Sequence, residues 1–93
     1  MNSMHLLVTG KVQGVGYRAT FAQVAMHLGL RGWVRNRHDG SVEACVQGST
    51  DAIDAIVDWA KRGPPAARVD EVVSTPAQDA TEEFPSFRIL PTL

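Results

Sequence analysis

The run KVQGVGYRAT, residues 11–20, places two glycines, an aromatic ring and an arginine between an apolar segment and a helix-like one. Gly14 and Gly16 permit a tight turn in which successive N–H groups point into one concavity. Arg18 would lie in the first turn of the next helix, where a cation opposes the helix dipole. A bound dianion explains it better, because a guanidinium grips an oxyanion through two parallel hydrogen bonds. The segment therefore predicts an anion-binding loop.

Other interpretations of the loop are weaker. Residues 14–19 match the dinucleotide-binding pattern G-x-G-x-x-A, but a doubly wound sheet needs more strands than 93 residues hold. The expected acid at the end of a second parallel strand, which would bind a ribose, is also missing: the chain offers Asn36 and Asp39 in that region, and neither occupies such a position. No glycine precedes a Lys-Ser or Lys-Thr pair, so a Walker motif is absent. A plain tight turn is the remaining alternative.

Asn36 is the second polar residue of interest, within GWVRNRHDGSVEACVQG at residues 32–48. Strand alternation puts its side chain with Val34 on the helix-covered face. Three bulky side chains face the other way: Trp33, Arg35 and Arg37. An amide buried at a strand end needs hydrogen-bond partners. On position alone, stabilisation of the hairpin turn is the simpler interpretation.

The elements that position these residues follow from hydrophobic periodicity. Residues 4–12 alternate as a strand, and four apolar residues then recur with helical spacing: Phe21, Val24, Ala25 and Leu28. Gly29 suits the C-terminal end of that helix. Residues 30–36 and 41–48 are predicted strands, joined by a hairpin turn at Asp39-Gly40.

The second half of the chain is predicted to contain a helix and two strands. Ser49 can cap a second helix, whose buried stripe is Ile53, Ile56, Val57 and Ala60. Residues 67–75 read as a fourth strand, and a polar loop at 76–83 leads to a short strand around Phe87. The order β-α-β-β-α-β with a short extra strand predicts an α+β fold, a ferredoxin-like α/β sandwich with an antiparallel sheet and two helices on one face.

Composition limits the partners. Residues 1–93 make one expected domain, and a net charge of −1 without a basic tract argues against nucleic acid. The first ten residues have no charged leader, and their apolar run is too short for a signal peptide or a membrane span. Cys45 is the single cysteine, which favours a reducing cytoplasm. Nothing in the sequence requires a partner, so we expect a monomer.

Two long motifs carry a family resemblance. GKVQGVGYR at 10–18 resembles the first signature of the acylphosphatase family, and residues 32–48 resemble its second. FRI at 87–89 resembles the closing strand of the family. The resemblance covers nearly the whole chain. It implies a ferredoxin-like fold and hydrolysis of acyl phosphates to a carboxylate and inorganic phosphate, with no metal ion or organic cofactor.

The resemblance also implies site residues. Arg18 would bind the phosphoryl oxygens, and Asn36 would orient the attacking water. The phosphate-binding loop would be completed by the backbone amides of Gln13, Gly14, Val15, Gly16 and Tyr17. Such a site is chemically sufficient, because a carboxylate with a conjugate-acid pKa of roughly 4 leaves without a proton donor. A loose phosphoryl-transfer transition state also asks little of the nucleophile.

The sequence leaves some roles open. His38 and the arginines at positions 31, 35 and 37 could assist substrate capture, but a solvated turn and an open sheet face around Trp33 are simpler interpretations. RNA binding on the sheet is disfavoured, because the expected central strands carry no aromatic residue. The stronger alternative to an enzyme is a non-catalytic module that binds acyl phosphate or another small anion for regulation, since a fold does not fix a function.

Overall fold

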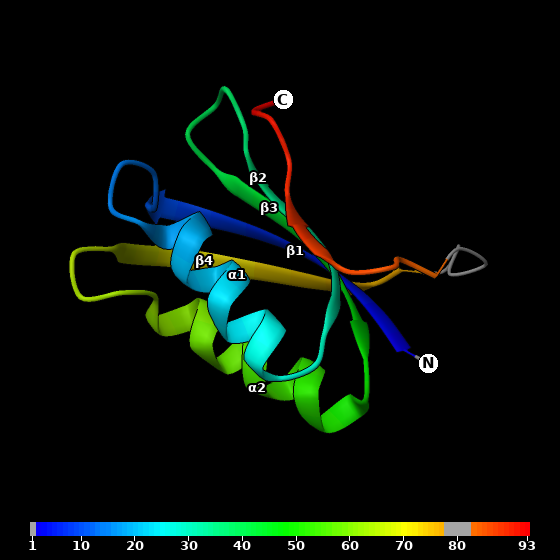
Figure 1. The fold of residues 1–93 in the computed structure, drawn as a ribbon. Coiled ribbons are helices and arrows are strands. Elements are labelled where there is room, and N and C mark those ends of the chain that lie inside the picture. The colour runs from blue at the N-terminus through cyan, green and yellow to red at the C-terminus, as the bar shows by residue number, and fades with distance from the viewer. Residues whose placement is uncertain (1, 78–82) are drawn as a thin grey trace.

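The computed structural model describes residues 2–77 and 83–93, and the predicted order of elements is confirmed (Figure 1). The strands and helices are β1 (Asn2–Lys11), α1 (Tyr17–His27), β2 (Arg31–Asn36), β3 (Val42–Gly48), α2 (Thr50–Arg62), β4 (Arg68–Pro76) and β5 (Phe87–Ile89). The predicted polar loop at 76–83 falls largely outside the described residues.

The sheet has the strand order β4-β1-β3-β2-β5. Its four long strands pair antiparallel, whereas β5 pairs parallel to β2. The prediction of an antiparallel sheet is therefore wrong at this one edge, and the sheet is mixed. The reason is the path of the chain: β4 ends at the end of the sheet where β2 begins. A chain that crosses the sheet there enters β5 in the direction of β2.

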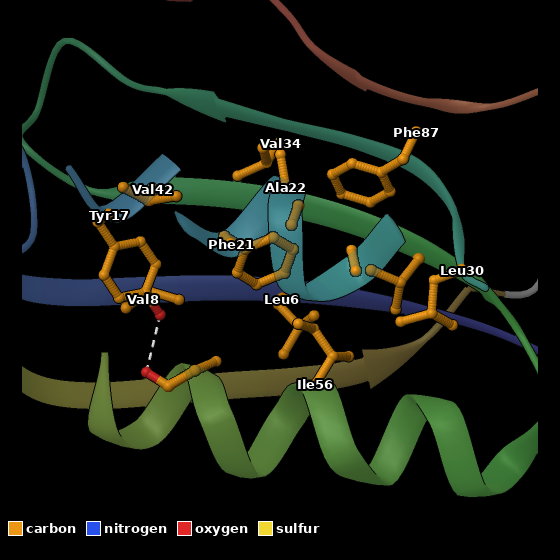
Figure 2. Close-up of a cluster of buried hydrophobic side chains, with 14 of the residues drawn as sticks. Leu6, Val8, Tyr17, Phe21, Ala22, Leu30, Val34, Val42, Ile56 and Phe87 are labelled. Atoms are coloured by element: carbon orange, nitrogen blue, oxygen red, sulfur yellow. Dashed lines mark hydrogen bonds between the residues drawn. The ribbon is translucent and has the colours of Figure 1, made fainter. Parts of the chain in front are cut away.

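Both helices cover the same face of the sheet, as predicted, with α1 against β2 and β5 and α2 against β4 and β1 (Figure 1). Phe21 of α1 and Ile56 of α2 point into a core that includes Leu6 of β1 (Figure 2). The stripe predicted for α2 is confirmed, with Val57 half-buried.

The buried face of α1 differs from the prediction. It consists of Tyr17, Phe21, Ala22 and Ala25, whereas Val24 and Leu28 are only half-buried. The helix contacts α2 as well as the sheet, so its buried face is turned from the stripe that the periodicity favoured. This rotation buries Tyr17, the first residue of the helix, beside the predicted anion-binding loop.

Local interactions define the helix ends and the hairpin turn at the positions that the sequence predicts. The Ser49 hydroxyl accepts a hydrogen bond from the Ala52 N–H at 3.1 Å, which caps α2. Gly29, with φ of 75°, follows α1 in the left-handed conformation. In the β2–β3 hairpin, the Asp39 carboxylate accepts the Ser41 N–H at 2.9 Å and fixes the turn.

Gly32 is a structural requirement that the sequence did not reveal. Its φ is 132°, and a Cβ there would overlap the backbone carbonyl of Cys45 on the paired strand. We expect Gly32→Ala to lower the free energy of unfolding by about 3 kcal/mol, from backbone strain and overpacking together. Urea denaturation measures this loss.

Gly40→Ala is the matched control. Gly40 also has a positive φ, of 94°, but a Cβ there meets nothing within 4 Å. Its replacement should cost only the backbone strain, about 1–2 kcal/mol. Equal losses in the two variants would contradict the steric explanation for Gly32.

Candidate active site

The loop between β1 and α1 has the backbone that an anion site requires. Gly14 and Gly16 adopt φ values of 75° and 78°, in the left-handed region. Gly16 caps α1 without any side-chain hydrogen bond, and the first turn of the helix holds no acidic residue. The N–H groups of that turn therefore keep their hydrogen-bonding capacity and the positive end of the helix dipole.

These residues enclose a cavity of about 140 Å³. It is lined by Val12, Gln13, Gly14, Gly16, Tyr17, Arg18, Ala19 and Asn36. The cavity joins the loop and the first turn of α1 to the end of β2, which is distant from them in the sequence. Of the predicted site residues only Val15 is absent from the lining, because its side chain packs against the core. Larger cavities of about 360 and 370 Å³ exist elsewhere, but no such glycine loop borders them.

Arg18 is half-buried at this cavity and makes no hydrogen bond or ion pair with any residue that the structure describes. Other arginines are paired: Arg35 and Arg37 contact the Glu43 carboxylate at 2.9 and 3.3 Å. A half-buried guanidinium beside free backbone N–H groups creates a strongly positive concavity. Its natural complement is an oxyanion that supplies several acceptor atoms.

Asn36 presents the second unpaired group. Its Oδ1 atom is buried and has no hydrogen-bond partner within residues 2–77 and 83–93. Buried carboxamide oxygens are normally paired with protein or with ordered water. Asn36, which carries this unsatisfied acceptor, is one of the residues that line the cavity beside Arg18. The predicted proximity of Arg18 and Asn36 is present in the fold.

Tyr17, which directly follows the loop, connects it to α2. Its ring is buried against Phe21 and Trp59, and its hydroxyl donates a 2.7 Å hydrogen bond to the Ala60 carbonyl of α2 (Figure 2). That carbonyl lies in the last turn of the helix, and four residues on is Pro64, which has no N–H to offer it. The hydroxyl thus replaces the missing helical donor and fixes the start of α1 to α2.

Gln13 does more than the sequence predicts. Beyond the backbone N–H assigned to it, its side-chain amide reaches the β2–β3 hairpin and donates to the carbonyls of Arg37 and Ser41 at 2.7 and 2.8 Å. Sequence reasoning missed this link, because no local pattern relates a loop residue to carbonyls 24 and 28 positions away.

The arginines of the second motif face away from the cavity. Glu43 on the outer sheet face accepts hydrogen bonds from Arg35 and contacts His5 at 2.7 Å, while Arg35 stacks on Trp33 at 4.7 Å. Burial alone would raise the pKa of Glu43, but the hydrogen bonds from His5 and Arg35 outweigh it and hold the pKa below its usual value. The open sheet face packed around Trp33 is the interpretation that this arrangement favours.

The other residues whose roles the sequence left undecided, Arg31 and His38, are not among the residues that line the cavity. Arg31 approaches Glu83 at 4.0 Å, and the exposed His38 donates its backbone N–H to the Leu93 carbonyl.

Burial and the nearby Glu43 raise the pKa of the Cys45 thiol, which disfavours a nucleophilic thiolate. Across the described ranges, no cluster of three or more His, Cys, Asp or Glu side chains could bind a metal ion. No described helix is both long and apolar enough to span a membrane.

The fold and the site together define a class of protein: a ferredoxin-like domain with a glycine-rich loop and an unpaired arginine at the start of its first helix. The sequence profile of the acylphosphatase family matches residues 4–89. An acylphosphatase of Pyrobaculum islandicum is 50% identical over 90 residues, which cover 96% of this chain and 94% of that protein. The chain therefore belongs to the acylphosphatase family, and the predicted resemblance is confirmed.

Solved structures agree with this assignment. The crystal structure of acylphosphatase from Bacillus subtilis matches with a TM-score of 0.92 and 34% identity, over 97% of this chain and 99% of that one. Full-length HypF, in a phosphate- and nucleotide-bound form, matches with a TM-score of 0.87 and 27% identity, over 98% of this chain but only 12% of HypF. The ferredoxin-like fold is confirmed, and the chain is a hydrolase of the acylphosphatase class.

Tyr17 is the only tyrosine in the chain, which makes its anchoring role measurable. Tyr17→Phe should lower the free energy of unfolding by about 1–2 kcal/mol, because the buried Ala60 carbonyl loses its donor. Burial also raises the pKa of the Tyr17 hydroxyl above its ordinary value of 10.0. The resulting stability is complete below the unfolded-state pKa and is lost as the pH rises towards the folded-state pKa.

An alkaline absorbance titration of the single phenol tests this directly. Ionisation should occur at higher pH in the native protein than in urea, and urea denaturation should reveal the loss in the Phe variant. Unchanged stability in Tyr17→Phe would show that the hydrogen bond to Ala60 contributes nothing, and an ordinary titration would show that the phenol is not buried.

Proposed function

We propose that Arg18 and the loop amides from Gln13 to Tyr17 hold the phosphoryl group of an acyl phosphate, while Asn36 orients a water for in-line attack. The observation that carries the proposal is the unpaired guanidinium of Arg18 at a cavity that Asn36 also lines. The amides of Gly14 and Val15 lie where the left-handed glycines turn the backbone.

The bonds exchanged in this reaction are few. The water oxygen attacks phosphorus, and the bond from phosphorus to the carboxylate oxygen breaks, with its electron pair leaving on the carboxylate. The water proton passes to solvent or to the phosphate formed. Because the leaving carboxylate has a conjugate-acid pKa of roughly 4, no residue has to protonate it. Catalysis then rests on placing the two reactants and on stabilising charge at the phosphoryl oxygens.

The proposed groups suit both tasks. A guanidinium donates two parallel hydrogen bonds to phosphoryl oxygens, and backbone N–H groups add fixed donors that need no reorganisation during the reaction. The carboxamide of Asn36 belongs to a residue that lines the same cavity, so we assign it the hydrogen bond that orients the water. A neutral amide is adequate here, since a loose transition state requires little activation of the water.

The proposal extends to the working form of the enzyme. Residues 1–93 act as one domain and as a monomer, on a small acyl phosphate, without a metal ion, an organic cofactor, a nucleic acid or a membrane. The single thiol of Cys45 suits a cytoplasmic location. The amides and Arg18 supply the positive charge that a metal ion supplies in many phosphoryl-transfer enzymes.

The alternative is a module that binds acyl phosphate or a small anion without turnover. The grip of Arg18 and the loop amides would serve such a module equally well, whereas membership of the acylphosphatase family and the position of Asn36 favour hydrolysis. Incubation of the purified protein with benzoyl phosphate or acetyl phosphate in the presence of EDTA separates the two. Phosphate release at a rate proportional to enzyme supports hydrolysis, whereas binding without release would establish the regulatory module.

Arg18→Ala should lower kcat/KM. The loss of transition-state stabilisation should exceed the roughly 3 kcal/mol typical of one preorganised donor, because the variant deletes a two-point grip. Arg18→Lys should restore little, since an ammonium cannot reproduce the planar fork. Steady-state hydrolysis of benzoyl phosphate measures both. Arg68→Ala is the matched control, because Arg68 is exposed on β4 and pairs with Asp70. Near-normal turnover in either Arg18 variant would refute the role of Arg18.

The pH dependence of kcat should be nearly flat from mildly acidic to mildly basic conditions. The proposed groups are a guanidinium, a carboxamide and backbone amides, none of which titrates in that range. Nearby carboxylates do not alter this, since hydrogen bonds from Ser41 hold the pKa of Asp39 below its usual value. Rates measured in buffers of constant ionic strength test the expectation. A steep bell centred near neutrality would reveal a general acid or base.

A further inference from the structure

The strand end that carries Asn36 is fixed on both sides. Asn36 pairs with Val42 of β3, and its carbonyl accepts a hydrogen bond from the Leu93 N–H at 3.0 Å. Two residues further along the chain, the His38 N–H donates a hydrogen bond to the Leu93 carbonyl, also at 3.0 Å. The C-terminal residues thus continue the pairing begun by β5, so the backbone at Asn36 is held within a sheet.

The loop opposite is held less firmly. Val12 is buried and Val15 packs partly on the core, but Gly14 and Gly16 are exposed and have no side chains that could hold them. Glycine has the largest conformational freedom of any residue, so such a loop needs external restraint to fix its position relative to the neighbouring segments. Tyr17 supplies restraint towards α2, on the side away from the hairpin.

Gln13 supplies restraint towards the hairpin. Its Nε2 atom donates to the carbonyls of Arg37 and Ser41, so both amide hydrogens are used and the carboxamide is fixed in orientation. Arg37 directly follows Asn36 in the chain, and its N–H is itself bonded to the Ser41 carbonyl at 2.9 Å. The two carbonyls that Gln13 contacts therefore belong to the rigid base of the hairpin.

We infer that the Gln13 side chain is a positioning residue, which sets the distance between the anion-binding loop and the carboxamide of Asn36. The inference rests on the proposed function. It adds a role for Gln13 that its backbone N–H does not perform: the side chain acts on the alignment of water with phosphorus, not on the affinity for phosphate. Arg18 and the loop amides lie together on one segment, so they bind an anion without reference to the hairpin.

Few side chains can replace Gln13 in this role. Asparagine has the two donor hydrogens but is one methylene shorter, so it cannot reach both carbonyls from the same backbone. Ionised glutamate has no donor and would face two carbonyl oxygens. Methionine approximates the length of glutamine and lacks the amide. Gln13→Met therefore removes the link while it preserves the backbone N–H and most of the packing.

We expect Gln13→Met to lower kcat for benzoyl phosphate by about 10- to 100-fold, the range that misplacement by up to an ångström produces. The inhibition constant of inorganic phosphate should change by less than about threefold, because the phosphate grip stays intact on its own segment. Gln13→Asn should behave similarly, and it serves as the second variant if Gln13→Met does not fold. Ser49→Ala is the control for stability: it removes the cap of α2 far from the cavity, and should leave kcat unchanged.

A double-mutant cycle identifies the route of the effect. If Gln13 acts through Asn36, then Gln13→Met should change kcat by less than about twofold in an Asn36→Ala background. Unchanged kcat in Gln13→Met, a parallel loss of phosphate affinity, or full additivity with Asn36→Ala would each overturn the inference. Absence of turnover by the wild-type protein would overturn the proposed function, and the inference with it.

Discussion

The proposed site depends on one constraint: the guanidinium of Arg18 has to remain without a carboxylate partner at the positive end of α1. In a chain with ten acidic residues this requires separation of charge. Glu43 pairs with Arg35, Arg37 and His5 on the outer sheet face, away from the cavity. The first turn of α1 contains no acid. The unfavourable placement of a cation beside a helix N-terminus is thus retained, and a dianion relieves it.

The fold holds this arrangement from three directions. Tyr17 ties the start of α1 to α2 by donating to a carbonyl that Pro64 leaves without a helical partner. Gln13 ties the loop to the hairpin, and Leu93 continues the sheet beside Asn36. The cavity therefore has walls from segments that are distant in sequence but joined through a small, closely packed core. Such rigidity suits a reaction in which alignment and fixed dipoles carry most of the catalysis.

Much of the fold and part of the candidate site were predictable from local sequence. The period of α2, the Ser49 cap and the Asp39-Gly40 turn depend on neighbours along the chain, and the structure reproduces them. The anomaly of Arg18 was visible for the same reason, since a cation in a first turn needs only the adjacent residues to be recognised. Asn36 was harder, because strand alternation alone could not separate a hairpin support from a site residue. Its importance came from the family resemblance, and its unpaired oxygen came from the coordinates.

The sequence by itself determined the order of elements, the glycine-rich loop with its unusual arginine and the family, because propensity, periodicity and motif spacing act over short stretches of chain. Only the tertiary structure decided the parallel edge strand, the rotation of α1, the steric demand at Gly32 and the reach of Gln13 to the hairpin. Each of these depends on which distant segments pack together. Contacts of that kind arise from burial of a shared core, which no local pattern specifies.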